Sequence, residues 1–271
     1  MKTYWNRLQS LAVARAGLCV NIDPHPEILR DWGLPETVDG LETCARTIVA
    51  ALGDKVAVLK PQSAFFEQHG SAGIAVLERV LKDISECGAL SILDVKRGDI
   101  GSTMAAYAEA YLTDDAPLAA DAITVSPYLG FDSLHPAFER AHETGRGVYV
   151  LARTSNPEGG SVQLAKTDAG TVAQEIVDRA TRLNEESGQF AVGLVIGATH
   201  ASIGADVSVF NSSILAPGIG AQGGTLDALP KLFGQAAGRV LPAVGRDLIC
   251  VGPDPSRLVE RLGLWTGGLW S

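Results

Sequence analysis

The chain has 271 residues, of which 46% are hydrophobic and 20% are charged, and its formal net charge is −9 at pH 7. This composition supplies a large apolar core and excludes global disorder. The acidic balance argues against broad binding to nucleic acid or to an anionic membrane, so a phosphate-bearing ligand would need a local site.

The cysteines and the N-terminus bear on the cellular compartment. Cys19, Cys44, Cys87 and Cys250 are scattered and form no C-x-x-C pair, which favours reduced thiols over a disulfide scaffold. The first ten residues, MKTYWNRLQS, are too polar for a signal peptide, and no apolar run approaches the roughly 18 residues of a membrane span. We therefore expect a cytoplasmic protein that does not cross a membrane.

Short apolar runs alternate with longer helical patterns along the chain. The runs that predict strands are residues 17–23, 55–60, 89–96, 122–126, 147–152, 190–197, 212–218 and 239–245. Helical patterns lie between several of these runs, at Asp39–Leu52, Ser71–Cys87, Ser102–Leu112 and Asp168–Glu186.

The order of these elements predicts the fold class. Near-continuous apolar strands separated by helices indicate a parallel sheet with both faces covered. Eight such strands in about 250 residues are typical of the α/β class and its (β/α)8 TIM barrel. An open doubly wound sheet is the alternative. No low-complexity linker divides the chain, so we predict one domain over residues 1–271.

Polar residues and glycines recur where the predicted strands end. They are Asp23, Lys60, Asp94, Lys96, Ser155, Gly218, Gly220 and Arg246. In a barrel the carboxyl ends of all strands meet on one face, where active sites are built. Side chains that are far apart in sequence would therefore converge there.

The segment DVKRGD, residues 94–99, places several charges after an apolar run. Asp94 and Lys96 are two positions apart on a strand and therefore share one face. With Lys60 from the neighbouring strand and Asp99 from the following loop, they could form an array of two ammonium and two carboxylate groups. Such an array suits a reaction that stabilises a carbanion and then protonates it. A surface ion-pair cluster at a helix start is the alternative.

The segment APGIGAQGG, residues 216–224, contains G-x-G-x-x-G at Gly218, Gly220 and Gly223. It comes late in the chain and lacks the acidic partner of a dinucleotide site. Backbone amides of a glycine-rich turn can also bind a single phosphate, and barrels commonly bind phosphate in the loops after strands seven and eight. Gln222 and Arg246 could add donors to that phosphate. A purely structural turn is the alternative.

Two further features complete the candidate site. Ser155 lies in the Gly-rich segment LARTSNPEGGSVQ and could bind a base edge or a carboxylate, although by itself this segment resembles an ordinary loop. The five histidines show no metal-ligand spacing. We therefore expect no metal.

Taken together, these motifs resemble a known family. Asp94-x-Lys96-x-x-Asp99-Ile100-x-x-Thr103 resembles the D-x-K-x-x-D-[IV]-x-x-T signature of the orotidine 5′-phosphate decarboxylase family. The segments NID, LKPQSAFFE, TSNPEGGSVQ, APGIGAQGG and VGRDLI follow in the family's order, so the resemblance spans about residues 15–260. The wording of two of these segments is similar to the longer bacterial branch found in mycobacteria and their relatives.

The resemblance implies a (β/α)8 barrel, a homodimer with active sites at the subunit interface, and decarboxylation of orotidine monophosphate (OMP) to uridine monophosphate (UMP). It also implies that no cofactor or metal takes part. Lys60, Asp94 and Lys96 would supply three members of the charged array, and Lys96 would stabilise and protonate C6 of the pyrimidine. Apart from the resemblance, the alternation of side chains along the strand predicts that Arg97 points away from this face.

The remaining positions carry over in the same way. Asp99 would reach the partner's site together with Ile100 and Thr103. The substrate-binding positions would be Asp23 and Lys60 for the ribose, Ser155 for the pyrimidine, and Gln222, the amides near Gly223 and Arg246 for the phosphate. Two alternatives stay open: a Mg²⁺-dependent sugar-phosphate synthase or decarboxylase of the same barrel superfamily, and a nucleotide-binding barrel without activity.

Overall fold

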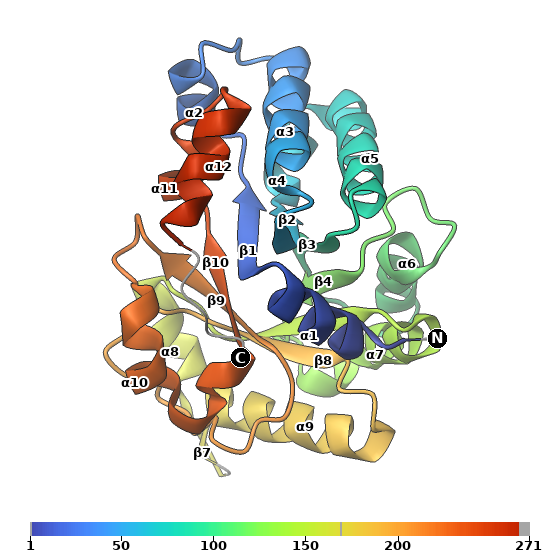
Figure 1. Ribbon diagram of the computed structural model, residues 1–271. Helices are drawn as coiled ribbons and strands as arrows, with labels where there is room; N and C mark the ends of the chain where they lie inside the picture. Colours follow the sequence, from blue (N-terminus) through green and yellow to red (C-terminus); the bar gives the residue numbers. More distant parts are fainter. Residues whose placement is uncertain (1, 169, 266–271) are drawn as a thin grey trace.

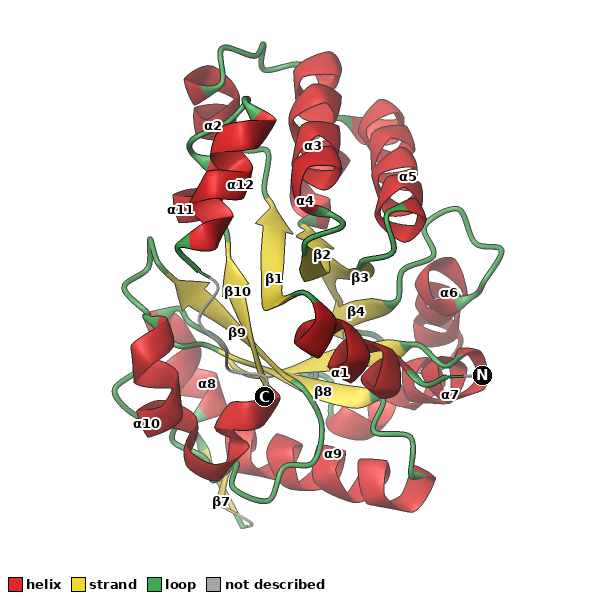
Figure 2. Ribbon diagram, viewed as in Figure 1, coloured by secondary structure: helices red, strands yellow, loops and turns green. Residues whose placement is uncertain are grey.

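Eight parallel strands close into a barrel in the computed structural model, which describes residues 2–168 and 170–265 (Figures 1 and 2). In chain order they are β1 (Ala16–Ile22), β2 (Val56–Pro61), β3 (Leu90–Arg97), β4 (Ala122–Val125), β5 (Gly147–Arg153), β8 (Val192–Ile196), β9 (Ile214–Ile219) and β10 (Val240–Val244). The last strand pairs with the first, with Cys19 opposite Ala243. Each strand lies within two residues of its predicted position. The barrel prediction is thereby confirmed, and the open sheet is wrong.

The strands hold their places because both of their faces are covered by apolar side chains. Every residue of β2, β4, β8 and β10 is buried. One part of the core lies between the sheet and the surrounding helices, and a second part fills the barrel interior. This two-sided burial accounts for the near-continuous apolar runs in the sequence. The predicted domain span, 1–271, includes residues 1, 169 and 266–271, which lie outside the described residues.

Helices surround the barrel, as Figure 2 shows. They are α2 (Pro26–Asp31), α3 (Val38–Leu52), α4 (Ser63–Glu67), α5 (Gly70–Glu86), α6 (Gly101–Leu112), α7 (His135–Thr144), α8 (Gly160–Gln163), α9 (Val172–Ser187), α10 (Leu229–Phe233), α11 (Arg246–Ile249) and α12 (Pro255–Gly263). Short 3₁₀ segments cover Phe131–Leu134, Pro157–Gly159, Leu226–Ala228 and Gly234–Arg239. Three of the four predicted helices are confirmed with their bounds within a residue.

The fourth predicted helix, Asp168–Glu186, begins four residues too early. A short antiparallel pair, β6 (Lys166–Thr167) and β7 (Gly170–Thr171), precedes α9. Gly170 has φ 129°, which is incompatible with a helix. The Thr171 side chain accepts a hydrogen bond from the Gln174 amide and so caps α9 at its true start.

A further helix, α1 (Tyr4–Ala14), lies across the amino ends of the strands and was not predicted (Figure 1). Its side chains Tyr4 and Leu8 are buried in the barrel interior. The Tyr4 and Tyr149 hydroxyls lie 3.0 Å apart, and Tyr149 donates to Ser213 Oγ at 2.9 Å. The functional groups described below lie at the opposite, carboxyl end of the parallel strands. No helix among the described residues is long and apolar enough to cross a membrane.

Candidate active site

Three charged side chains at the carboxyl ends of β2 and β3 form a continuous hydrogen-bonded array. Lys60 Nζ donates to Asp94 Oδ2 at 2.8 Å, and Lys96 Nζ donates to Asp94 Oδ1 at 2.6 Å. Lys60 and Asp94 are buried, whereas the Lys96 side chain is 45% exposed. The structure therefore brings three predicted site residues together and leaves Lys96 as the member that faces solvent.

The array keeps its charges although it is buried. Burial alone would raise the pKa of Asp94, but the positive charges of Lys60 and Lys96 outweigh it and hold this pKa well below its usual range. Burial alone would lower the pKa of Lys60, but Asp94 and then Asp23 outweigh it and raise this pKa. Asp94 is therefore a carboxylate and Lys60 an ammonium throughout the physiological pH range.

Two uncharged side chains complete the surroundings of Asp94, and neither was predicted. Thr124 of β4 donates its hydroxyl hydrogen to Asp94 Oδ1 at 2.8 Å. The amide of Gln62, with its nitrogen facing Asp94, donates to the Asp94 carbonyl at 2.8 Å and lies 3.3 Å from Oδ2. Each carboxylate oxygen thus receives one ammonium and one neutral donor, which fixes its orientation.

Lys96 itself has an unusual backbone conformation. Its φ is 44°, in the left-handed region that costs a non-glycine residue about 1–2 kcal/mol. The pairing of β3 with β4 shifts register between Leu93 and Arg97. The Lys96 amide donates to Thr124 Oγ1 at 3.0 Å, across this irregularity. Backbone strain of this kind is typical of functional positions.

Asp23, just beyond the end of β1, lies next to the array. Asn21 Nδ2 donates to Asp23 Oδ2 at 3.1 Å, and Asn21 is the register partner of Lys60. The other oxygen, Oδ1, is shielded from solvent and has no hydrogen-bond partner among the described residues. Burial raises the pKa of Asp23 and outweighs the opposing charge of Lys60. This carboxylate has free capacity to accept a hydrogen bond from a ligand hydroxyl.

The Gly-rich segment after β9 forms a tight turn. Gly218, Gly220 and Gly223 all have positive φ, so the turn depends on glycine. The Gly223 amide donates to the Gly220 carbonyl at 2.7 Å. A side chain at Gly218 would collide with Thr199 and would lie 3.5 Å from Ser155 Cβ. The structure therefore places Ser155, after β5, beside this turn.

The loop after β10 packs against the same turn. A Cβ atom at Gly220 would lie 2.6 Å from a carboxylate oxygen of Asp247, the neighbour of Arg246. Arg246 is the first residue of α11, and its Nη1 lies 3.8 Å from Glu27 Oε2. Arg246 and Gln222 are both exposed. Two exposed donors thus flank a glycine turn, an arrangement that can hold a phosphate.

The structure does not bring Asp99, Ile100 and Thr103 into this array. Asp99 Oδ1 accepts a hydrogen bond from the Ile100 amide at 2.8 Å, and within the described chain Asp99 makes no ion pair with either lysine of the array. Ile100 is 62% exposed, and Thr103 is exposed on α6. Asp99 itself is partly exposed, and all three residues lie outside the array of their own chain.

Arg97 points away from the array, as expected. Its Nη2 donates to Glu67 Oε1 at 2.7 Å, and its guanidinium lies over the Tyr107 ring, 5.6 Å from the centroid. Arg97 therefore fixes the β3 end against α4 and α6. Within residues 2–168 and 170–265, no three His, Cys, Asp or Glu side chains form a metal-binding group.

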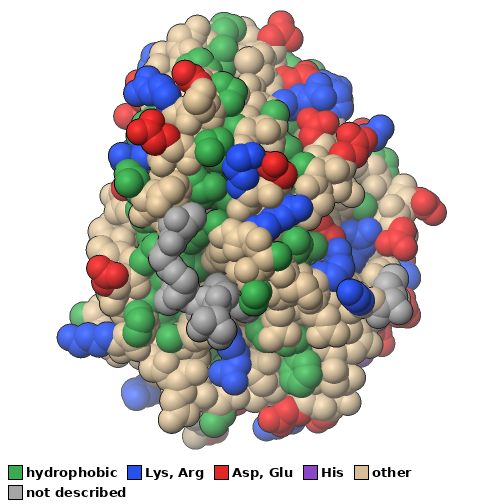
Figure 3. Space-filling model, in the orientation of Figure 1, with side chains coloured by type: hydrophobic (Ala, Val, Ile, Leu, Met, Phe, Trp, Pro, Cys, Tyr) green, Lys and Arg blue, Asp and Glu red, His purple; other side chains and the backbone are tan. Residues whose placement is uncertain are grey.

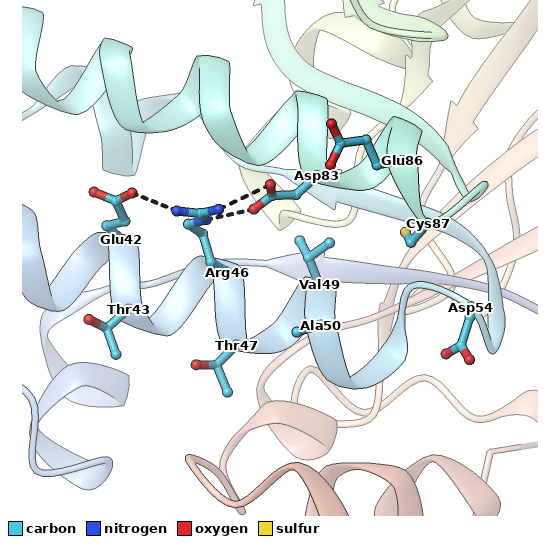
Figure 4. Close-up of a pocket in the computed structure, with 10 residues that line it drawn as sticks. All are labelled: Glu42, Thr43, Arg46, Thr47, Val49, Ala50, Asp54, Asp83, Glu86 and Cys87. Carbon is cyan, nitrogen blue, oxygen red and sulfur yellow. Dashed lines mark hydrogen bonds and ion pairs between the residues drawn. The ribbon is translucent and has the colours of Figure 1, made fainter.

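A charged groove between α3 and α5 lies outside the barrel (Figure 4). Arg46 of α3 donates to Asp83 of α5 at 2.6 Å and to Glu42 at 3.2 Å. No member of the array lines this groove. Acidic and basic side chains are likewise interspersed on the face shown in Figure 3. The Arg46–Asp83 pair joins α3 to α5, whereas the Arg46–Glu42 pair lies within α3, so we interpret this groove as a structural contact.

Comparisons with known proteins agree with this geometry. The sequence model described as "Orotidine 5'-phosphate decarboxylase / HUMPS family" matches residues 17–262. An orotidine 5′-phosphate decarboxylase of Salinispora arenicola is 52% identical over 260 residues, which cover 95% of this chain and 94% of that protein. One from Streptomyces coelicolor is 50% identical over 262 residues, covering 95% and 94%.

A solved structure gives the same result. The crystal structure of a candidate orotidine 5′-phosphate decarboxylase from Streptomyces avermitilis superimposes with a TM-score of 0.94 at 48% identity, covering 98% of this chain and 94% of that one. The resemblance carried by the Asp94–Thr103 motif is thereby confirmed. The chain belongs to the orotidine 5′-phosphate decarboxylase family, whose members are carboxy-lyases of UMP synthesis.

Proposed function

We propose that this chain converts OMP to UMP without a cofactor or metal, with Lys96 as electrostatic stabiliser and proton donor to C6. The observation that carries the proposal is the Lys60–Asp94–Lys96 array at the open end of the barrel. Of its two ammonium groups only Lys96 is exposed, which favours Lys96 over Lys60 as the group that faces the reacting carbon.

The chemistry follows from the charges of the array. When the bond between C6 and the carboxylate breaks, its electron pair stays on C6, where the pyrimidine ring delocalises it poorly. The Lys96 ammonium stabilises this developing charge and then transfers one N–H proton to C6. Lys96 is left as a neutral amine that regains a proton from solvent. Asp94, with a donor on every side, serves to orient Lys96.

Binding energy from groups distant from C6 would assemble the site. The unpaired oxygen of Asp23 and the buried Lys60 would hold the ribose hydroxyls. Ser155 would contact the pyrimidine. The phosphate would lie against the glycine turn and exchange the 3.8 Å contact between Glu27 and Arg246 for a charge-assisted bond. Gln222 and the backbone near Gly223 would add to this clamp.

The site is completed by a second copy of the chain. Asp99, Ile100 and Thr103 serve no group of their own array. Ile100 and Thr103 are exposed and Asp99 is partly exposed, which supports a role in the partner's site. The large apolar side chains of Ile100, Tyr128 and Leu129 are also exposed. They belong to adjacent loops, since the Ser126 amide donates to the Arg97 carbonyl. An apolar surface next to the site favours a homodimer.

The four cysteines support the predicted compartment. All are free thiols, and Cys19 and Cys44 are buried. A reduced cytoplasmic setting suits such thiols.

The direct test follows the loss of OMP absorbance with Lys96→Ala. A lost electrostatic donor costs roughly 10²–10³ in kcat and a lost general acid roughly 10²–10⁴, so we expect kcat to fall at least about 10⁴-fold. Lys82→Ala, on the surface of α5, is the matched control and should keep full activity. A Lys96→Ala enzyme with near wild-type kcat would show that the assignment is wrong.

The same assay separates the sugar-phosphate alternative. Dialysis against EDTA should leave OMP turnover unchanged, because no step requires a divalent ion. An enzyme that is silent on OMP but acts on a sugar phosphate only after Mg²⁺ is added would instead belong to the alternative class.

A further inference from the structure

Thr124 is the one polar side chain of β4, whose other residues are Ala122, Ile123 and Val125. It is 1% exposed and lies next to the end of β3. A buried hydroxyl in an otherwise apolar strand needs partners. Its partners both belong to the charged array.

The Thr124 hydroxyl has one donor and two acceptor positions, and the two contacts use them in a defined direction. The Lys96 amide can only donate, so Oγ1 accepts from it at 3.0 Å. The Asp94 carboxylate can only accept, so the hydroxyl hydrogen goes to Oδ1 at 2.8 Å. Lys96 Nζ donates to that same oxygen at 2.6 Å. A closed ring of hydrogen bonds therefore joins the backbone and the ammonium of Lys96 through Thr124 and Asp94.

This ring acts where the backbone is strained. Lys96 has φ 44°, and the ladder between β3 and β4 is interrupted beside it. Its amide therefore has no regular strand partner and depends on the Thr124 hydroxyl. Without this contact, the residue can return to an ordinary conformation, which would turn the Lys96 side chain away from Asp94.

We propose that Thr124 is a positioning residue that holds Lys96 in its left-handed conformation and thereby aims the Lys96 ammonium at the reacting carbon. The proposal rests on the role proposed for Lys96. It predicts that the hydroxyl matters and that the shape of the side chain does not.

The test compares Thr124→Val, which keeps the shape, with Thr124→Ser, which keeps the hydroxyl. A displacement of about 1 Å in a reacting group can cost roughly 10²-fold, so we expect kcat of Thr124→Val to fall 10- to 100-fold. KM for OMP should change little, because Thr124 does not touch the groups that hold phosphate or ribose. Thr124→Ser should stay within a few-fold of wild type. Ser213→Ala, which removes another buried hydroxyl from the barrel interior, is the matched control and should keep kcat.

Thermal unfolding of both variants separates positioning from general destabilisation. A loss of kcat in folded Thr124→Val, with KM nearly unchanged and with activity kept in Thr124→Ser, marks positioning. Equal losses in the Val and Ser variants, or a Val variant with wild-type kcat, would overturn the proposal. If Thr124→Val does not fold, Thr124→Ala supplies the same comparison. A wild-type chain inactive on OMP, or an active Lys96→Ala, would instead overturn the proposed function.

Discussion

Asp23 and Asp94 are two aspartates close to Lys60, yet their pKa values move in opposite directions. Both carboxylate oxygens of Asp94 accept hydrogen bonds, and the attraction of Lys60 and Lys96 outweighs the effect of burial on its pKa. Asp23 receives one hydrogen bond, from Asn21, and keeps one oxygen unpaired. Without bound substrate, the ionised Asp23 therefore lowers the stability of the fold, as expected for a group that binds a ligand.

Replacing Asp23 by Asn tests this cost. Folding raises the pKa of Asp23, so its protonation contributes to the free energy of unfolding at pH values below the unfolded pKa, which is about 3.9. This contribution is lost as the pH rises through the pKa of the folded state. Asn does not titrate, so Asp23→Asn should be about 1 kcal/mol more stable than wild type at pH 8. At pH 4 this gain in stability should be smaller. Thermal unfolding at both pH values measures this. KM for OMP should rise at least tenfold, and a variant that gains no stability at pH 8 would contradict the prediction.

Among single residues, the sequence predicted the charged side chains of the site but not the neutral side chains that bind them. Lys60, Asp94 and Lys96 were found because charge at the end of an apolar strand is conspicuous. Thr124 and Gln62 were not, because threonine is common in strands and a glutamine after a strand carries no signal. Their roles depend on how β4 and β2 align with β3, and this register is a property of the assembled sheet.

At the scale of elements, α1 shows what a local pattern leaves out. Tyr4, Leu8 and Ala12 are four residues apart and buried, as in an amphipathic helix. These residues cover the amino ends of the strands, and this surface exists only after the strands have assembled. The strands were easier to predict because burial on both faces leaves a continuous apolar run. The start of α9 was missed because Gly170 and Thr171 act through local backbone geometry.

Leu8 provides a test of α1. It is fully buried, so Leu8→Ala should lower the free energy of unfolding by about 2–5 kcal/mol. Because α1 lies at the end of the barrel opposite the array, kcat at a permissive temperature should not change. Val13→Ala, at a 70% exposed position of the same helix, is the control and should leave stability nearly unchanged. Denaturant titration and the OMP assay together check both statements, and a loss of kcat in folded Leu8→Ala would contradict this separation.

At the scale of the whole molecule, the proposed homodimer would have one chain supply parts of two sites. The array and the proposed phosphate clamp would belong to one site, while Asp99, Ile100 and Thr103, which stand outside the array, would belong to the other. A site that needs a second chain would leave no pattern in a single sequence. The shared site was therefore expected only from the family resemblance, and the exposed apolar side chains of Ile100, Tyr128 and Leu129 favour it.

Mixing two inactive variants tests the shared site. A heterodimer of Lys96→Ala and Asp99→Ala has one site with both defects and one intact site. Equal mixing should therefore restore about one quarter of wild-type activity, provided that subunits exchange at random. The OMP assay after co-refolding measures this, with each variant refolded alone as the control. Verified heterodimers without recovered activity would mean that each site is built within one chain.

The pairing of β10 with β1 has a consequence for how the protein is made. During synthesis Asp23 and Lys60 leave the ribosome before Arg246. Until the final strand docks between β9 and β1, the sheet keeps two open edges that can pair with other chains. Contacts between residues as distant as Cys19 and Ala243 also form slowly. The nascent chain therefore keeps these edges open until β10 has been made, and the same pairing that closes the barrel brings Arg246 to the end of the barrel that carries the array.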